Sequence, residues 1–286
     1  MKRVFVFFIL FGCLAQSRAN TSINVTNKYA YGANVGWMDW RGDTNNGAVI
    51  GEFVCSGFIY SANVGWINLG SGAPTNGIQY KNLGATDFGI NHDGVGNLRG
   101  FAYGANIGWI NFEANGAPKV NLKNGTLSGF IYSANCGWIS LSNATAHVQT
   151  DTIPAGVDSN ANSLPDAWER TFFGALGVSP AADADGDGMS NKQEYLAGTN
   201  PTNSLDNLRI IGFSSLPGGT SANLTWNSVL SRSYLIQENL NLNSSLWSDS
   251  GLGQIFPVGT STTRTVPGTN APMRFYRVEA VRPLAP

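Results

Sequence analysis

The sequence predicts a mainly β protein, and three observations lead to this prediction. A short phrase rich in Tyr, Asn, Gly and Trp occurs four times in the first half, glycine makes up 35 of 286 residues, and only 12% of residues are charged. Ordinary soluble domains are about 25% charged and about 7% glycine. Many short strands joined by turns fit this composition best, and the repetition sets the architecture of the first half.

Residues 1–19 have the pattern of a secretory signal peptide. Basic residues precede an apolar run from Val4 to Ala15, which is shorter than the roughly 20 residues of a membrane span. The mature chain is expected to begin near Asn20 and to be secreted or placed on the cell surface. Alternatively, Leu10-Phe-Gly-Cys13 is a rough lipobox that would leave a lipid anchor on Cys13. No later segment has an apolar run long enough to predict a transmembrane helix.

The distribution of charge divides the mature chain into three modules. Residues 20–150 contain six acidic and six basic side chains, residues 151–204 contain eight and two, and residues 205–286 contain four and six. A chain of this length is expected to form more than one domain. No module has the basic stripe that nucleic-acid binding requires, so nucleic acid is not an expected partner.

Residues 20–150 predict an antiparallel β repeat domain. Aromatic and β-branched residues lie on both sides of an Ala-Asn-x-Gly break, which is typical of two short strands joined by a turn. Asn124-Gly125 predicts a further hairpin. The four copies of the phrase are Tyr31-Gly-Ala-Asn-Val-Gly-Trp37, Tyr60-Ser-Ala-Asn-Val-Gly-Trp66, Tyr103-Gly-Ala-Asn-Ile-Gly-Trp109 and Tyr132-Ser-Ala-Asn-Cys-Gly-Trp138.

The repeated rings have two interpretations. A single hairpin cannot bury its own apolar face, so stacked copies would bury their rings in a shared core, and the invariance of Trp favours this. Residues that vary after the first phrase would then be better ligand candidates, namely Asp39, Trp40, Arg41 and Asp43. In the other interpretation, the rings are exposed platforms for sugars beside hydrogen-bonding amides of the phrase. This interpretation assigns ligand contacts to Trp37, Trp66, Trp109 and Trp138, with Asn34, Asn63, Asn106 and Asn135 as donors.

Residues 151–204 contain the most specific chemical signal, a calcium loop of the EF-hand type. Positions 1, 3, 5, 9 and 12 of the loop hold oxygen-bearing side chains, and Gly188 at position 6 permits a sharp bend. A hard cation takes six to eight oxygens, including a backbone carbonyl from position 7. The predicted ligands are Asp183, Asp185, Asp187, Met189, Asn191 and Glu194.

A second copy of the frame begins twenty-five residues earlier. Asn replaces Asp at its positions 3 and 5, and Ser163 replaces Gly, so this loop is expected to bind calcium more weakly. Its predicted ligands are Asp158, Asn160, Asn162, Leu164, Asp166 and Glu169. Short helices are expected at 165–173 and 190–196. The segment resembles the dockerin and thrombospondin type 3-like calcium repeats of bacterial secreted proteins, and one or two calcium ions are expected.

Residues 205–286 predict a small β-sandwich. Strand-like runs lie between Gly, Pro, Ser and Asn, and their spacing is similar to that of a fibronectin type III domain. A Gly-Trp-Ile-Asn repeat block, a twin calcium segment and this sandwich together resemble multi-domain secreted proteins of environmental bacteria. The resemblance implies a location and a modular construction, and it implies no catalytic residue.

The sequence favours a secreted or cell-surface calcium-binding protein that binds extracellular polysaccharide through its repeats and is not an enzyme. One alternative is a structural or adhesive protein that binds other proteins. Another is an extracellular hydrolase or lyase, which would need convergent carboxylates or an activated nucleophile. His92 and His147 are expected to be structural or solvated. Cys55 and Cys136 are expected to be free thiols, although a disulfide is possible in an oxidising compartment.

Overall fold

The computed structural model describes residues 21–42, 45–216, 221–267 and 273–286. The described residues are mainly β with two α helices, which confirms the predicted fold class. The predicted signal segment 1–19, Cys13 and Asp43 lie outside them.

The helices are η1 (Ala114–Gly116), α1 (Asp166–Phe173) and α2 (Asn191–Ala197). The strands are β1 (Ile23–Gly32), β2 (Gly36–Asp39), β3 (Val49–Ile50), β4 (Cys55–Ser61), β5 (Gly65–Ser71), β6 (Ile90–His92), β7 (Leu98–Gly104), β8 (Gly108–Asn111), β9 (Lys119–Val120), β10 (Leu127–Ser128), β11 (Phe130–Ser133), β12 (Gly137–Ser140), β13 (Val148–Thr150), β14 (Ile210–Ser215), β15 (Ser221–Asn227), β16 (Ser233–Asn239), β17 (Ser248–Asp249), β18 (Ser261–Pro267) and β19 (Phe275–Val281).

Four hairpins of the repeat region close into a ring of eight strands. Each phrase forms the turn of one hairpin, and the hairpins are β1–β2, β4–β5, β7–β8 and β11–β12. Neighbouring hairpins pair through β2–β4, β5–β7 and β8–β11, and β12 pairs with β1. Each strand of the ring therefore has a partner on both sides, which removes the open edges of a sheet built from hairpins.

The repeated tryptophans lie on the outside of this ring, so the prediction that they form its core is wrong. The side chains of Trp37, Trp66, Trp109 and Trp138 are 47%, 45%, 42% and 50% exposed, whereas the residues that follow them, Met38, Ile67, Ile110 and Ile139, are fully buried. Successive side chains of a strand point to opposite faces. The interior of an eight-stranded ring is just wide enough for side chains to fill it, and the Ile and Met that follow each Trp take part in filling it.

The repeated asparagine ties each turn to the turn of the preceding hairpin. The Nδ2 atoms of Asn63, Asn106 and Asn135 donate to the carbonyls of Val35, Val64 and Ile107 at 3.0, 3.3 and 2.9 Å. Asn34 completes the circle by donating to the carbonyl of Cys136 at 3.1 Å. These amides, which one interpretation assigned to a sugar, therefore hold the ring together.

Shorter strands extend the ring and close its core. β13 pairs with β1, β3 with β4 and β6 with β7, while β9 and β10 form the hairpin that Asn124-Gly125 predicted. The core is built from branched aliphatic side chains together with Trp40 and Phe112. Cys55 is buried in it, and burial raises the pKa of its thiol to about 12. Cys55 and Cys136 are both free thiols, as predicted.

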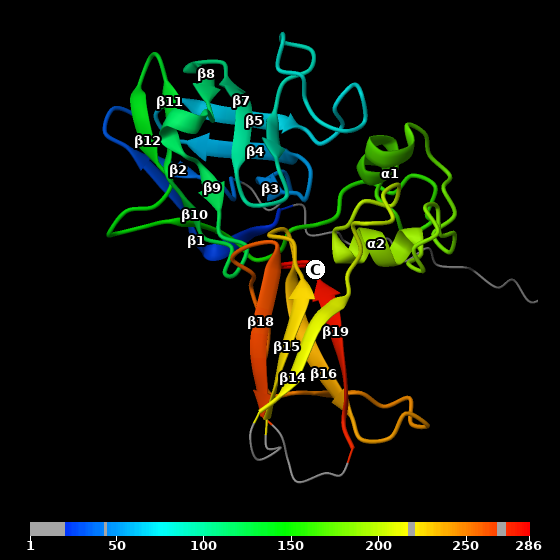
Figure 1. Cartoon of the computed structure of the whole chain (residues 1–286). Helices are drawn as coiled ribbons and strands as arrows, with labels where there is room; N and C mark the ends of the chain where they lie inside the picture. Colours follow the sequence, from blue (N-terminus) through cyan, green and yellow to red (C-terminus); the bar gives the residue numbers. More distant parts are fainter. Residues whose placement is uncertain (1–20, 43–44, 217–220, 268–272) are drawn as a thin grey trace, which may run out of the picture.

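The two helices of the acidic segment lie beside the ring (Figure 1). Ser190 caps α2 in a capping box with Gln193, and Gly198 ends the helix in a left-handed conformation. Trp168 of α1 packs against Tyr195 of α2 with their ring centroids 5.8 Å apart. Phe53 of the repeat region packs against the same cluster, so the helices and the ring share a small apolar core.

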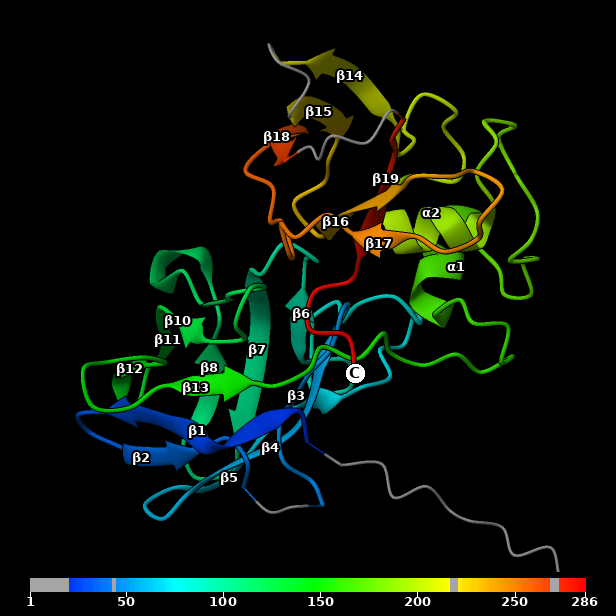
Figure 2. The ribbon, with the colours of Figure 1, turned by 90° about the horizontal axis from the view of Figure 1, so that it is seen from below.

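The C-terminal residues form two three-stranded antiparallel sheets, β14-β15-β18 and β17-β16-β19. Trp226 and Tyr234 lie at the centre of the core between them. After β19 the chain returns to the ring, where the Leu284 carbonyl accepts from the Ile153 backbone N–H at 2.7 Å. Figures 1 and 2 show the C-terminus at the junction of the three parts.

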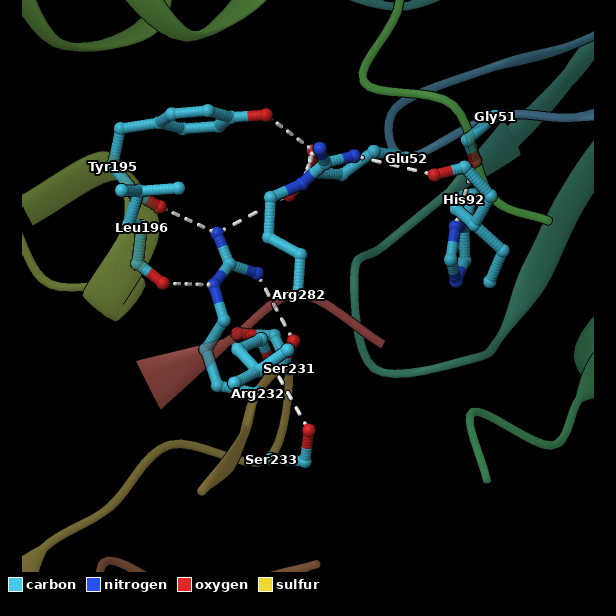
Figure 3. Close-up of polar contacts among 11 residues, drawn as sticks. Gly51, Glu52, His92, Tyr195, Leu196, Ser231, Arg232, Ser233 and Arg282 are labelled. Atoms are coloured by element: carbon cyan, nitrogen blue, oxygen red, sulfur yellow. Dashed lines mark hydrogen bonds and ion pairs between the residues drawn. The ribbon is translucent and has the colours of Figure 1, made fainter. Parts of the chain in front are cut away.

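A buried carboxylate holds this junction (Figure 3). Glu52 of the repeat region accepts from the Tyr195 hydroxyl of α2 at 2.9 Å and from Arg282 Nε at 2.9 Å. Arg232 pairs with the other oxygen of Glu52 at 3.2 Å and donates to the carbonyls of Tyr195 and Leu196 at the end of α2. All three parts of the chain therefore meet at one ionic network.

Candidate functional site

The loop of residues 183–194 gathers carboxylates around a common centre. Asp183, Asp185 and Asp187 each place a carboxylate oxygen within 4.8 Å of the other two. Backbone N–H groups of the loop hold all three: Gly186 and Gly188 donate to the two oxygens of Asp183 at 2.8 and 2.9 Å. The Asp187 N–H donates to Asp185 Oδ1 at 3.2 Å, and the Met189 N–H donates to Asp187 Oδ1 at 2.8 Å. The backbone thus fixes the three carboxylates and leaves the Oδ2 atoms of Asp185 and Asp187 without a donor.

Four buried oxygens of this loop have no hydrogen-bond donor among the residues that the structure describes. They are Asp185 Oδ2, Asp187 Oδ2, Asn191 Oδ1 and Glu194 Oε2. Burial, together with the negative charges of Asp185, Asp187 and Asp183, raises the pKa of Glu194 to about 7. Buried acceptors are normally paired, and like charges at close range repel. A cation at the centre would satisfy both conditions.

The chemistry of this donor set fits calcium. Hard cations take carboxylate, amide and backbone oxygens, and calcium accepts six to eight of them in flexible geometry. The side chains of Asp183, Asp185, Asp187, Asn191 and Glu194 would hold it, with the Met189 carbonyl as the backbone ligand. The described residues therefore contain an acidic cluster that could hold a metal ion, at the place where the sequence predicts one.

The loop of residues 158–169 has the same frame with a different centre. Glu169 is fully buried, and its Oε1 accepts from the backbone N–H groups of Gly177 and Val178, both at 2.8 Å. Asn162 Nδ2 donates to the same oxygen at 3.0 Å, and Asn160 Nδ2 donates to Oε2 at 3.1 Å. Protein donors therefore already satisfy the carboxylate that would close a calcium shell.

Backbone contacts fix the orientation of these two amides. Asn160 Oδ1 accepts from the Asn162 backbone N–H at 3.1 Å, and Asn162 Oδ1 accepts from that of Leu164 at 2.8 Å. In the other loop the equivalent Oδ1 atoms of Asp185 and Asp187 make the same contacts. An Asn that keeps this contact places an NH2 group at the point where Asp places a second oxygen. The first loop thus presents donors to its own centre.

A second candidate site is the outer face of the ring, which is covered by aromatic side chains. In each hairpin the repeated Tyr lies 4.9–5.0 Å from the repeated Trp, with 55–59° between the ring planes. A third ring, from Tyr29, Phe58, Phe101 or Phe130, meets the same Trp edge-on at 6.1–6.3 Å. The described Tyr and Trp rings of the phrases are each 39–50% exposed.

These side chains form four rows that each cross four neighbouring strands. Every row has an aromatic ring, a polar side chain, a Tyr and a Trp as successive cross-strand partners. The rows are Tyr29-Asp39-Tyr60-Trp66, Phe58-Asn68-Tyr103-Trp109, Phe101-Asn111-Tyr132-Trp138 and Phe130-Ser140-Tyr31-Trp37. We call this surface the outer aromatic face. It combines flat apolar rings with hydrogen-bonding groups at regular intervals.

Only part of the predicted ligand surface after the first phrase lies on this face. Trp40 is fully buried in the core, so its prediction as a ligand contact is wrong. It lies two residues after the buried Met38 and therefore faces the same inward side. Asp39 faces outward and forms an ion pair with Lys28 at 2.7 Å. Arg41 is half-buried and donates to the carbonyl of Ile23. The charged groups of Asp39 and Arg41 therefore both have partners within the protein.

Asp87, Asp93 and His92, which could contribute to a catalytic site, have local partners. Asp87 accepts from Thr75, and Asp93 accepts from the backbone and side chain of Asn97. His92 is buried, and its two ring nitrogens lie 2.9 Å from the Gly51 carbonyl and 3.1 Å from the Gly96 N–H. Burial lowers the pKa of His92. His92 therefore has a structural role, as expected.

The predicted ligand residues named the repeated tryptophans but not the Tyr and Phe rings beside them. Tyr31, Tyr60, Tyr103 and Tyr132 lie beside the exposed tryptophans, as do the third rings of each hairpin. A usable signal was present, because Tyr29 and Tyr31, or Phe58 and Tyr60, are two residues apart and so share one face of a strand. The polar residues of the rows, Asp39, Asn68, Asn111 and Ser140, carry no such local signal. They lie beside the rings only because neighbouring hairpins pair with each other.

No family model, curated protein or solved structure matches this chain. Among the described residues, no helix is long and apolar enough to span a membrane.

Proposed function

We propose that this protein is an extracellular or cell-surface protein that binds polysaccharide on its outer aromatic face and holds calcium in the loop of residues 183–194. The observation that carries this proposal is the fourfold set of exposed Tyr–Trp pairs with nearly equal geometry. Monomeric proteins rarely expose large contiguous apolar patches unless the patch binds something. The role is binding, without catalysis.

The chemistry of the face favours a sugar polymer. An indole or phenol ring offers a flat apolar face and a polar edge, so the C–H face of a sugar packs on the ring while its hydroxyls reach neighbouring polar groups. Each row supplies such a group between its rings, as Asn68 and Asn111 do. The repetition around the ring matches a ligand that is itself a repeating chain.

Calcium in this proposal braces the arrangement of the parts. Glu194, which would close the ion's shell, directly precedes Tyr195, whose hydroxyl binds Glu52 at the junction. An ion at about 100 times its dissociation constant adds about 2.7 kcal/mol to the free energy of unfolding. Extracellular modules of this type commonly bind calcium in the range of about 10⁻⁴–10⁻³ M, which suits a permanent brace.

A second candidate function, adhesion to other proteins, is favoured by strand β14. This strand is at the end of its sheet, and its side chains Ile210, Ile211 and Phe213 are 38%, 51% and 62% exposed. An apolar edge strand can pair with a strand of another chain. The ring itself has no such edge among its eight strands, so the outer aromatic face favours sugar.

A glycan array with the full mature chain, with calcium and with EDTA, tests the proposal. We expect binding to a polysaccharide class that is lost when Trp37, Trp66, Trp109 and Trp138 are each replaced by Ala in one variant. Phe213→Ala is the matched control. It removes an exposed aromatic side chain from strand β14, which is not part of the repeat hairpins, and should leave glycan binding unchanged. If the wild type binds no glycan on the array, the proposal of polysaccharide binding is rejected. If the wild type self-associates and Phe213→Ala abolishes this, adhesion to other proteins is supported.

A further inference from the structure

A hollow lies in the row Phe101-Asn111-Tyr132-Trp138 of the outer aromatic face. It has a volume of about 220 Å³ and is lined by Asn111, Glu113, Asn115, Gly116, Tyr132 and Trp138. Sites for drug-sized ligands measure about 300–1,000 Å³, so this hollow suits one small ring. It lies between the third and fourth hairpins, where η1 follows β8 and passes beside Trp138.

The polar floor of the hollow is Asn111. Its Oδ1 atom is buried and has no hydrogen-bond donor among the described residues. Asn111 faces outward from β8, with Phe101 and Tyr132 as its cross-strand partners. A buried amide oxygen without a donor is uncommon, because its desolvation is not compensated. Asn111 lines the hollow, so a ligand hydroxyl there would supply that donor once the amide turns its oxygen toward the hollow.

The equivalent positions of the other three rows have partners within the protein. Asp39 accepts from Lys28 Nζ at 2.7 Å, Asn68 Oδ1 accepts from the Gly70 N–H at 2.8 Å, and Ser140 Oγ donates to the Ser142 carbonyl at 2.7 Å. The repeat is therefore regular in its rings and differs in its polar member. Asn111 is the member whose oxygen is left for a ligand.

The apolar wall of the hollow is also the most open of the four. Trp138 is 50% exposed, the highest value among the repeated tryptophans, and Tyr132 beside it is 40% exposed. By contrast, Phe88 lies edge-on against Trp109 at 5.1 Å and covers part of that ring. Trp138 can thus take the face of a ligand ring.

The rim contains one carboxylate and one amide. Glu113 precedes η1, and its side chain makes no capping hydrogen bond to that helix. Glu113 and Asn115 are both exposed. A negative rim disfavours acidic sugars, while carboxylate and amide groups accept hydrogen bonds from hydroxyls.

We infer that the hollow between the third and fourth hairpins is the primary subsite for one pyranose unit of a neutral polysaccharide, with Trp138 as the stacking platform and Asn111 Oδ1 as the acceptor of a sugar hydroxyl. This inference rests on the proposed function and names the position on the outer aromatic face where binding is strongest. The other rows then contact the polymer more weakly.

Isothermal titration of the full mature chain with cellohexaose, mannohexaose, xylohexaose and laminarihexaose tests the subsite. For the best ligand we expect Trp138→Ala and Asn111→Leu each to raise the dissociation constant about tenfold, since a hydroxyl then loses its partner or its ring loses its platform. Trp37→Ala removes a similarly exposed indole from another row and, as the comparison variant, should raise the constant less than about threefold. Phe213→Ala, at a position outside the outer aromatic face, is the control and should leave the constant unchanged. Asn111→Leu should leave the melting temperature unchanged or higher, because it removes a buried oxygen without a donor.

The outcomes separate this inference from the proposal on which it rests. Equal losses in Trp37→Ala and Trp138→Ala, or unchanged binding by Asn111→Leu, would overturn the subsite while polysaccharide binding stands. If the wild type binds none of the four hexasaccharides and no glycan on the array, both fall.

Discussion

The loops of residues 158–169 and 183–194 have the same backbone and opposite centres. Positions 4 and 6 are left-handed in both, with φ of 56° and 72° at Ala161 and Ser163 and of 78° and 96° at Gly186 and Gly188. The first loop directs amide nitrogens at its buried Glu169, and the second directs carboxylate oxygens towards Glu194. Protein donors satisfy the carboxylate at the centre of the first loop. In the second loop the carboxylates repel one another unless a cation lies between them.

The difference teaches that the twelve-residue frame by itself does not identify a metal site. The frame sets the backbone turns and the Oδ1 contacts, which Asn and Asp make equally well. The second atom of each side chain decides the chemistry of the centre, because it is a donor in Asn and an acceptor in Asp. We therefore expect the first loop to fold around hydrogen bonds and the second around an ion.

The largest expected effect follows from replacing both amides of the first loop, in the variant Asn160→Asp/Asn162→Asp. The variant loses two hydrogen bonds to Glu169, each worth about 1.5–3 kcal/mol because one partner is charged. In EDTA we expect the free energy of unfolding to fall by about 3 kcal/mol or more. Calcium should restore it, and denaturant unfolding with and without calcium measures both effects. An unchanged stability in EDTA would contradict the assigned hydrogen bonds.

The next effect is expected from Glu194→Gln in the second loop. Even the outer partners of metal ligands are worth about 10–100-fold in affinity, so loss of this carboxylate should weaken calcium binding by more than about 100-fold. In EDTA the variant should melt higher than the wild type, because one of four crowded negative charges is removed. Calorimetric titration and thermal melts measure these changes.

Glu169→Gln in the first loop is the matched control for that variant. It should lower the melting temperature, because Gln places an NH2 group either against the Asn160 donor or against the donors of Asn162, Gly177 and Val178. It should leave calcium binding intact. If Glu169→Gln weakens calcium binding as much as Glu194→Gln does, the assignment of roles to the two loops is wrong.

The pH dependence of stability gives a smaller effect. The pKa of Glu194 is raised from 4.5 to about 7 on folding, so the folded chain without metal binds this proton more tightly than the unfolded chain. Its contribution is complete below pH 4.5 and is lost as the pH rises through 7. His92 acts in the opposite direction, because its pKa is lowered by burial.

The test is therefore the difference between the wild type and Glu194→Gln in EDTA. We expect the wild type to lose melting temperature relative to the variant between pH 5 and pH 8. In calcium the wild type should gain instead, since the ion competes with the proton for Glu194. Parallel curves for the two proteins in EDTA would show that Glu194 keeps an ordinary pKa.

The smallest effect is expected from Tyr195→Phe, which removes one of three donors from Glu52 at the junction. The ion pairs with Arg232 and Arg282 remain, so the loss should be about 1 kcal/mol, or about 2–4 °C in melting temperature. Phe retains the contact with Trp168. Because the hydroxyl links the calcium-loop helix to the ring, calcium should also raise the melting temperature of the variant less than that of the wild type. Equal calcium shifts in both proteins would separate the loop from the junction.

The sequence predicted the hairpins, both helices and the position of the acidic cluster, because each depends on short-range signals. Strand-turn-strand patterns around Ala-Asn-x-Gly and the spacing of Asp183 to Glu194 are local. The closing of the ring was not predictable in the same way. It depends on pairing of β12 with β1 and on the contact from Asn34 to Cys136, which are more than a hundred residues apart.

The side of the sheet occupied by tryptophan was predicted wrongly for a related reason. Trp and the following Ile are both apolar and both repeated, so hydrophobicity alone does not decide which faces inward. The aligned series Trp40, Leu69, Phe112 and Leu141, all buried, has the same parity as the Ile series. Two apolar series therefore share one side of the strands, and the repeated Trp is on the other side. Counting both series would have predicted that the Ile side faces inward and the Trp side faces outward.

The central claim is that one of the two loops holds calcium and the other does not. Native mass spectrometry of the full mature chain in excess calcium counts the bound ions directly, with Glu194→Gln measured beside the wild type. The account predicts one ion in the wild type that is lost in Glu194→Gln. Two specifically bound ions, none, or one that persists in Glu194→Gln would contradict it.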